Sequence, residues 1–235
     1  MNLRLVGAYW RIVVGVGLVA AVPLLLIGDR LIARSEGDAI GGEIARIAAG
    51  SPQQWLAGSL LFLLGLVLLL PAVLGLVQLA RTRGVLLANL GGTLAVLGVV
   101  GFVGLNALNY VLYQFAVTLE QEQMIEFAGG MNGNPGFAVI MSLVMFGFYP
   151  GLALLAVGLW RESSVPVWVA ACLLLGVSVL FLGSGGIFNV VGFGVMAFGL
   201  GWTGIRVLGS SGNTWAGVDS ASNRAEQDGP RTVSA

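Results

Sequence analysis

Residues 55–80 read WLAGSLLFLLGLVLLLPAVLGLVQLA, and this stretch contains no charged residue. A helix needs about 20 apolar residues to cross the hydrocarbon core of a bilayer, so the stretch is long enough to span one. The short basic turn Arg81-Thr82-Arg83-Gly84 follows it, and a second apolar run begins at Val85. The pattern predicts two membrane-spanning helices joined by a tight turn.

The composition of the whole chain agrees with this prediction. The 235 residues are 57% hydrophobic and 9% charged, whereas soluble domains carry about 25% charged residues. So few charges cannot supply the polar surface that solubility needs, and a bilayer is the expected solvent.

Apolar runs recur along the chain and predict an all-α polytopic transmembrane bundle of about six helices. One transmembrane domain is expected over residues 1–208, followed by a disordered tail, 209–235, that is rich in Ser, Gly and charge. An uncharged turn, Gly183-Ser184-Gly185-Gly186, separates the last two spans. The expected spans are residues 9–27, 55–80, 85–112, 137–160, 166–182 and 187–207.

Two segments permit alternative interpretations. The first span has the basic end and apolar core of a secretory signal, but the spans downstream of it favour a retained helix. In the polar stretch 28–52, Ile40, Ile44 and Ile47 have helical spacing. That stretch is therefore either a short helix on the membrane surface or a plain connecting loop.

Arginine placement predicts that both termini are cytoplasmic. With the N-terminus inside, only Arg30, Arg34 and Arg46 of the eleven arginines fall outside, whereas seven of the eleven acidic residues do. Tryptophans are enriched at membrane interfaces. The cytoplasmic interface is expected to hold Trp10, Trp160, Trp168 and Trp202, and the outer interface is expected to hold Trp55.

The residue types that are missing exclude several chemistries. The chain has no Lys and no His, so Schiff-base, His-ligated metal and His general-base sites are excluded. Cys172 is the single cysteine. No Asp or Glu lies inside an expected span, and proton-coupled transporters usually need such a carboxylate. Glu120, Glu122 and Glu126 indicate either weak cation binding or a solvated acidic loop.

A polar face on the third helix is the main candidate for a binding site. Its spacing of i, i+3, i+4, i+7 and i+8 places all the side chains on one side of the helix. Amide groups are costly against acyl chains. The face therefore lines a cavity for a small or amphipathic molecule, or it forms interhelical hydrogen bonds or leaves the bilayer for the headgroups. It consists of Asn106, Asn109, Tyr110, Tyr113 and Gln114.

Prolines and glycines inside the spans predict local geometry. Pro71 and Pro150 are candidate kinks, since proline frees a backbone carbonyl. Such breaks line binding sites in transporters, and they are also common structural features. Residues 199–204, GLGWTG, match a dinucleotide-binding pattern, but they lie within an apolar span, where small residues favour close helix packing. Gly98, Gly101 and Gly104 suggest the same packing.

The order of these features resembles a loose group of uncharacterised bacterial six-helix membrane proteins, a domain-of-unknown-function type common in actinobacteria. The similar features are Trp10-Arg11 at the start of the first helix, a polar segment after it, and a proline-containing helix ending in LARTRG, residues 79–84. The resemblance covers most of residues 5–208 and rests on layout and composition. It implies no known activity and no functional residues.

The sequence thus predicts a multi-pass protein of a bacterial plasma membrane, with no cofactor, no metal and no catalytic site. Arginine in place of lysine, with abundant Gly, Ala, Val and Leu, is typical of a GC-rich bacterial genome. The expected role is non-enzymatic, as an accessory, structural or interaction component. The alternative is a binder or transporter of a small lipophilic or amphipathic molecule. The expected partners are the lipid bilayer and other membrane proteins or further copies of the chain, and no nucleic acid.

Overall fold

A computed structural model describes residues 3–32, 52–80, 83–118, 134–183 and 186–210. This part of the chain contains helices and no strand, as the sequence predicts. The elements are α1 (Leu3–Leu31), α3 (Pro52–Leu79), α4 (Val85–Thr118), α6 (Pro135–Ser142), the π-helix η1 (Leu143–Phe148), α7 (Tyr149–Glu162), α8 (Val167–Leu182) and α9 (Gly186–Gly209).

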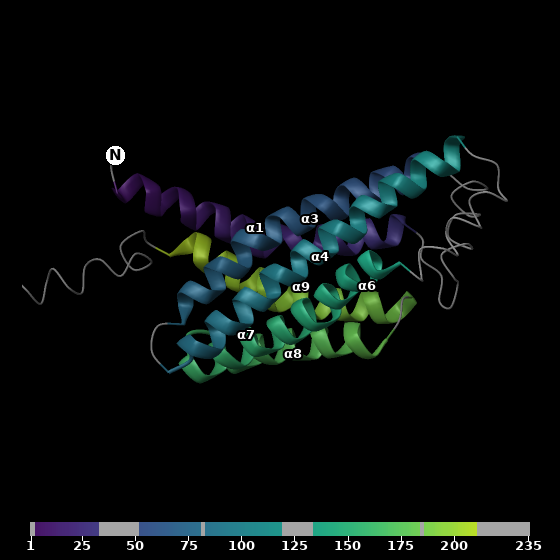
Figure 1. The fold of residues 1–235 in the computed structure, drawn as a ribbon. Helices are drawn as coiled ribbons and strands as arrows, with labels where there is room; N and C mark the ends of the chain where they lie inside the picture. Colours follow the sequence, from purple (N-terminus) through teal and green to yellow (C-terminus); the bar gives the residue numbers. More distant parts are fainter. Residues whose placement is uncertain (1–2, 33–51, 81–82, 119–133, 184–185, 211–235) are drawn as a thin grey trace, which may run out of the picture.

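The helices form a closed bundle in which each one packs against its neighbours in sequence (Figure 1). α6, η1 and α7 run on from one another and act as one long element beside α4. The ring closes where α9 packs against α1. There the Arg11 guanidinium donates to the Ser210 carbonyl oxygen, so the start of α1 and the end of α9 lie at the same end of the bundle.

When α6, η1 and α7 are counted as one element, the described part of the chain has six elements. Five of them are long and apolar enough to cross a membrane. α8 is the exception, because its 16 residues extend for only about 24 Å against a hydrocarbon core of roughly 30 Å. α4 is the opposite case: its 34 residues reach about 50 Å, and its C-terminal end projects beyond the neighbouring helices in Figure 1.

Glycine at seven-residue intervals sets the contact between α4 and α7. A Cβ atom at Gly91 would lie 2.7 Å from the Gly151 carbonyl oxygen, and one at Gly158 would lie 2.7 Å from the Ala88 nitrogen. Gly84 and Gly98 approach the facing backbone in the same way. These two helices therefore touch backbone to backbone, a separation that larger side chains would prevent.

The same arrangement recurs in other helix pairs. Gly28 and Gly58 bring α1 against α3, and Gly176 and Gly192 bring α8 against α9. In the GLGWTG stretch, a Cβ atom at Gly204 would lie 2.8 Å from the Gly15 carbonyl oxygen. The packing interpretation of this stretch therefore holds, because the motif lies inside α9 and its last glycine forms the contact with α1.

A chain of aromatic rings runs from α3 through α4 and the η1–α7 segment to α8. Phe102 of α4 contacts Phe62 of α3 and Phe148 of η1, with ring centroids 6.0 and 4.9 Å apart. From Phe148 the chain continues through Tyr149 to Phe181 of α8. Tilted and edge-to-face ring pairs of this kind stabilise a core beyond their buried area.

The two prolines behave differently. Pro71 lies within an uninterrupted α3. Before Pro150 the chain leaves α-helical geometry, since residues Leu143–Phe148 form a π-helix. Proline has no backbone N–H to give to the preceding turn, and π-segments insert where the regular ladder is broken. Pro150 therefore marks a real irregularity, whereas a bend at Pro71 stays a prediction.

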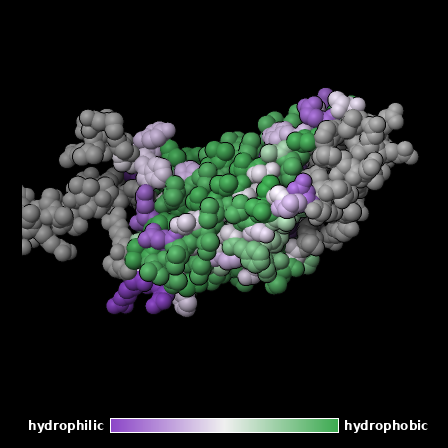
Figure 2. All heavy atoms as spheres, viewed as in Figure 1, coloured by the Kyte–Doolittle hydropathy of each residue, from purple (hydrophilic) through white to green (hydrophobic). Residues whose placement is uncertain are grey.

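The surface carries an apolar band between two more polar ends (Figure 2). Among the side chains that the structure describes, four arginines and Glu162 lie at one end, which is called the basic end below. The opposite end holds Asp29 and Arg30. This distribution is that of an integral membrane protein. The arginines of the basic end are Arg11, Arg83, Arg161 and Arg206.

The first helix extends beyond the expected span of residues 9–27. It continues to Leu31, where Gly28 packs on Gly58 and Asp29 is buried against α9. Three predictions lie outside the described residues: the surface helix of Ile40, Ile44 and Ile47, the acidic stretch of Glu120, Glu122 and Glu126, and the tail from residue 211 onward.

Candidate functional site

The polar face of α4 divides between the interior and the surface. Asn106 and Asn109 are buried, at 1% and 7% exposure. Tyr110 is half-buried, Tyr113 packs against the edge of the core, and Gln114 is exposed. The buried part of the face, Asn106 and Asn109, faces α3.

Two hydrogen bonds tie this face to α3. The Asn106 side-chain amide donates to the Ser59 carbonyl oxygen at 3.2 Å. One turn earlier in α3, the Trp55 indole N–H donates to the Asn109 carbonyl oxygen at 3.4 Å. Trp55, Ser59, Asn106, Asn109 and Tyr110 together are called the α3–α4 polar seam below.

Three polar atoms of the seam are buried and have no hydrogen-bond partner among the described residues. They are the Ser59 hydroxyl, the Asn106 amide oxygen and the Tyr110 hydroxyl. Each such atom costs about 1–3 kcal/mol relative to a satisfied one. Buried polar atoms normally have a hydrogen-bond partner, so the identity of the group that pairs with these three atoms bears on the function.

The seam can donate and accept hydrogen bonds but carries no charge. The Asn106 oxygen only accepts, while the Ser59 and Tyr110 hydroxyls can do both. No charged side chain belongs to the seam. The arrangement suits a neutral hydroxyl or amide group rather than a carboxylate or an ammonium.

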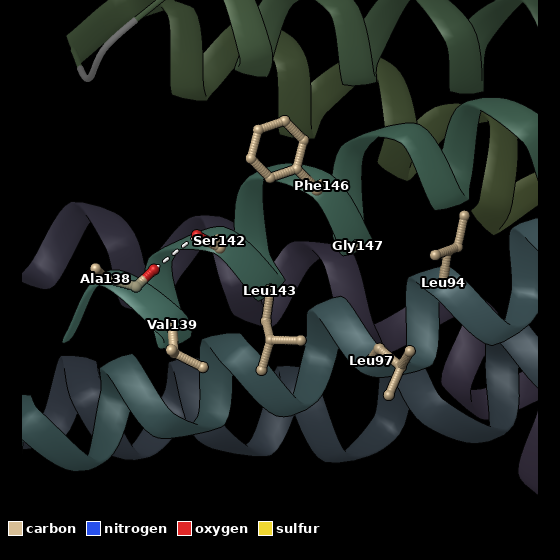
Figure 3. Close-up of a pocket in the computed structure, with 8 residues that line it drawn as sticks. All are labelled: Leu94, Leu97, Ala138, Val139, Ser142, Leu143, Phe146 and Gly147. Carbon is tan, nitrogen blue, oxygen red and sulfur yellow. Dashed lines mark hydrogen bonds between the residues drawn. The ribbon is translucent and has the colours of Figure 1, made fainter. Parts of the chain in front are cut away.

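Two pockets open on other parts of the surface. One, of about 390 Å³, lies between α4 and the α6–η1 segment (Figure 3). Its only side-chain hydroxyl, that of Ser142, donates to the Ala138 carbonyl oxygen within its own helix. The other, of about 210 Å³, lies beside Pro150 and Ser178 between α7 and α8. Neither pocket includes a residue of the seam, so the cavity-lining role of the α4 face stays a prediction.

A second polar group is one that the sequence analysis missed. Asp29 is 2% exposed. The Asn189 amide of α9 donates to both of its carboxylate oxygens at 3.1 Å, and the Arg30 guanidinium donates to one of them at 2.9 Å. The available signal was that Leu31 and Ile32 continue the apolar pattern beyond Asp29.

Ser59 was also missed. It is the only hydroxyl residue within residues 55–80, which is a weak signal by itself. Its significance depends on Asn106, which is 47 positions away in the sequence. Only the packing of α3 against α4 brings these two residues together.

The described residues contain no group of three or more His, Cys, Asp or Glu side chains that could hold a metal ion. Cys172 is a free thiol that packs against Gly199. No protein-family model matches this chain, and neither a curated protein nor a solved structure matches it.

Proposed function

We propose that this protein is a non-enzymatic membrane protein that binds a small amphipathic molecule through the α3–α4 polar seam. One observation carries the proposal: Ser59 and Asn106, each 1% exposed, hold buried polar atoms that no described residue satisfies. A neutral hydroxyl or amide head would supply the missing hydrogen bonds. Its apolar tail would remain in the surrounding hydrocarbon.

Photolabelling of the full chain in phosphatidylcholine nanodiscs tests this proposal. The probe is a long-chain monoacylglycerol with a diazirine in its chain, because its head offers uncharged hydroxyls. We expect labelled peptides from α3 and α4 on either side of Ser59 and Asn106. The double substitution Ser59→Ala and Asn106→Leu removes two of the three unpartnered polar atoms, and it should reduce this labelling at least fivefold.

The matched control is Gln114→Leu, which removes an amide from the exposed end of the same helix face. Labelling of the control should equal that of the native chain. Undiminished labelling of the double variant would show that the seam does not bind the probe. The same labelling with a probe that has a methyl ester in place of the free hydroxyls would also contradict the proposal.

A second candidate function is that of an accessory or structural component that assembles with other membrane proteins or with further copies of the chain. Gly194 and Gly201 of α9 favour it. A Cβ atom added at either would meet nothing within 4 Å, whereas Gly192 and Gly199 of the same helix contact α8. Light scattering of the purified protein tests this candidate, since a monomer that co-purifies with no stoichiometric partner would argue against it.

The membrane and the orientation belong to the proposal as well. We place the chain in a bacterial plasma membrane with its basic end in the cytoplasm. Support comes from the arginines at that end and from the positive-inside rule.

A further inference from the structure

The basic end carries more cations than acids among the described side chains, with four arginines against Glu162. Glu162 is the only acidic side chain described there, and it accepts the Gly84 backbone N–H at 3.0 Å. No ion pair joins Arg83, Arg161 or Arg206 to another described residue. At the opposite end, Asp29 and Arg30 neutralise each other. Among the described side chains, the excess positive charge therefore lies at this one end of the bundle.

Arg206 differs from the other described arginines of the basic end because its guanidinium lies over an aromatic ring. It lies 4.1 Å from the centroid of the Trp202 ring. Trp202 in turn contacts Trp168 of α8 edge to face, with centroids 5.0 Å apart. The Trp202 ring contacts the guanidinium, whose N–H groups form no hydrogen bond with another described residue.

Below Arg206, the same side of α9 becomes steadily less polar. Phe198, Trp202 and Arg206 are four residues apart, so they lie above one another at intervals of about 6 Å. Phe198 is 68% exposed, and its ring contacts Trp168 with centroids 5.4 Å apart. The surface thus changes from apolar to amphipathic to cationic towards the end of the helix.

We propose that Phe198, Trp202 and Arg206, with Trp168, form a binding site for an anionic phospholipid. The order of the three side chains along α9 matches that of acyl chain, glycerol and phosphate in a lipid molecule. Tryptophan prefers the headgroup level of a bilayer, and a guanidinium donates paired hydrogen bonds to phosphate oxygens. This site is separate from the α3–α4 polar seam and does not depend on the function proposed for it.

Native mass spectrometry of the full chain in detergent tests this site. Phosphatidylglycerol and phosphatidylcholine with the same acyl chains are added at equal concentration, and the ratio of the two lipid adducts is measured. We expect the native chain to favour phosphatidylglycerol. Arg206→Gln should lower this preference about fivefold, the effect of one arginine near an anionic membrane surface. Trp202→Leu should lower it too, because the guanidinium loses the ring that holds it.

Arg83→Gln and Arg161→Gln are the matched controls, since each removes one unpaired arginine from the same end. Both should keep most of the preference. If either control lost as much as Arg206→Gln, general attraction by the basic end would explain the binding and the site would be refuted. An unchanged preference in Arg206→Gln would refute it as well.

Soluble competitors distinguish a lipid from other anions. Glycerol phosphate has the same phosphate chemistry but no acyl chain, and an acidic peptide represents a protein partner. We expect neither to displace phosphatidylglycerol at a tenfold molar excess over the lipid. Displacement by either competitor would show that the site formed by Phe198, Trp202 and Arg206 does not select the lipid.

Discussion

Asp29 is the residue whose environment departs most from its expected place in an external loop. Its carboxylate is buried at the contact between α1 and α9 and depends on Asn189 and Arg30 for hydrogen bonds. A buried charge is tolerated only when it is paired. The Asn189 amide lies 160 positions away in the sequence and joins the last helix of the ring to the first.

This pairing predicts a non-additive response to substitution. Asn189→Leu leaves the carboxylate without its amide donor and should lower the free energy of unfolding by about 1–3 kcal/mol. Replacing both partners, Asp29→Leu with Asn189→Leu, removes the buried charge together with its donor. The double variant should therefore be more stable than Asn189→Leu alone.

The measurement is reversible unfolding in mixed micelles of the native chain, the two single variants Asp29→Leu and Asn189→Leu, and the double variant. Asn109→Leu serves as the control for the loss of a buried Asn elsewhere in the bundle. Its effect on the free energy of unfolding should be the same with and without Asp29→Leu. Strict additivity of the Asp29 and Asn189 effects would contradict the coupling described above.

Sequence reasoning reached only part of the residue-scale picture. The spacing of Asn106, Asn109 and Tyr110 is sufficient to place them on one face of a helix. It cannot show that Asn106 bonds to Ser59, or that the Ser59 hydroxyl is left without a partner. Those facts depend on the rotation of α3 against α4, which no local pattern encodes.

At the scale of the element, glycine determines how closely two helices approach. The contact of α4 with the η1–α7 segment uses Gly91 and Gly98, with Gly84 just before α4, on one side and Gly151 and Gly158 on the other. Spacings of seven residues keep these positions on one side of each helix. Association in a membrane then depends on van der Waals contact between backbones, since lipid offers no hydrophobic driving force.

Adding one methyl group should have opposite effects on stability at a glycine that packs against another helix and at one that packs against nothing. Gly91→Ala would place a Cβ atom 2.7 Å from the Gly151 carbonyl oxygen, and overpacking of this kind costs about 1–3 kcal/mol. Gly201→Ala makes the same chemical change where nothing lies within 4 Å. The greater helix propensity of alanine should stabilise that variant by up to about 1 kcal/mol.

Thermal unfolding of both variants in one detergent checks this prediction, with circular dichroism as the readout. The transition temperature should fall for Gly91→Ala and stay level or rise for Gly201→Ala. Equal shifts in the two variants would show that the α4–α7 backbone contact does not limit the stability of the bundle.

Glycine-rich helix faces could be predicted from the sequence, and Gly98, Gly101 and Gly104 do contact η1 or α6. The π-helix before Pro150 could not. Proline marks a position where the α-helical ladder is broken, but several local geometries can absorb the break. In this structure the break takes the form of a π-helix, and Gly147 of that π-helix packs against Gly98 of α4.

At the scale of the molecule, the basic end gives the bundle a direction. Single cysteines test it in a Cys172→Ser background. Ser164→Cys lies in the exposed turn between α7 and α8 at the basic end, and Asn134→Cys lies at the opposite end, before α6. If the positive-inside rule governs insertion, a membrane-impermeant maleimide should label Asn134→Cys in intact cells and Ser164→Cys only after lysis.

The reverse labelling pattern would place the basic end outside and refute the proposed orientation. Equal labelling of the two positions in intact cells would refute a single orientation. Permeabilised cells provide the control, because both cysteines should react there.

The sequence by itself determined the class of structure and the order of its parts. Long uncharged apolar runs require a bilayer, and a bilayer requires helices, because every backbone polar group must be satisfied within the chain. These constraints are local, so they can be derived without knowledge of contacts. They predicted the all-helical bundle that the described residues form.

Only the tertiary structure decided which helix faces meet. It closed the ring through α1 and α9, brought Asp29 to Asn189 and placed Ser59 against Asn106. It also showed that α8 is shorter than a full span. The physical reason is that apolar helices in lipid have almost uniform surfaces. Their mutual rotation depends on the fit of glycines and a few polar groups over long sequence distances.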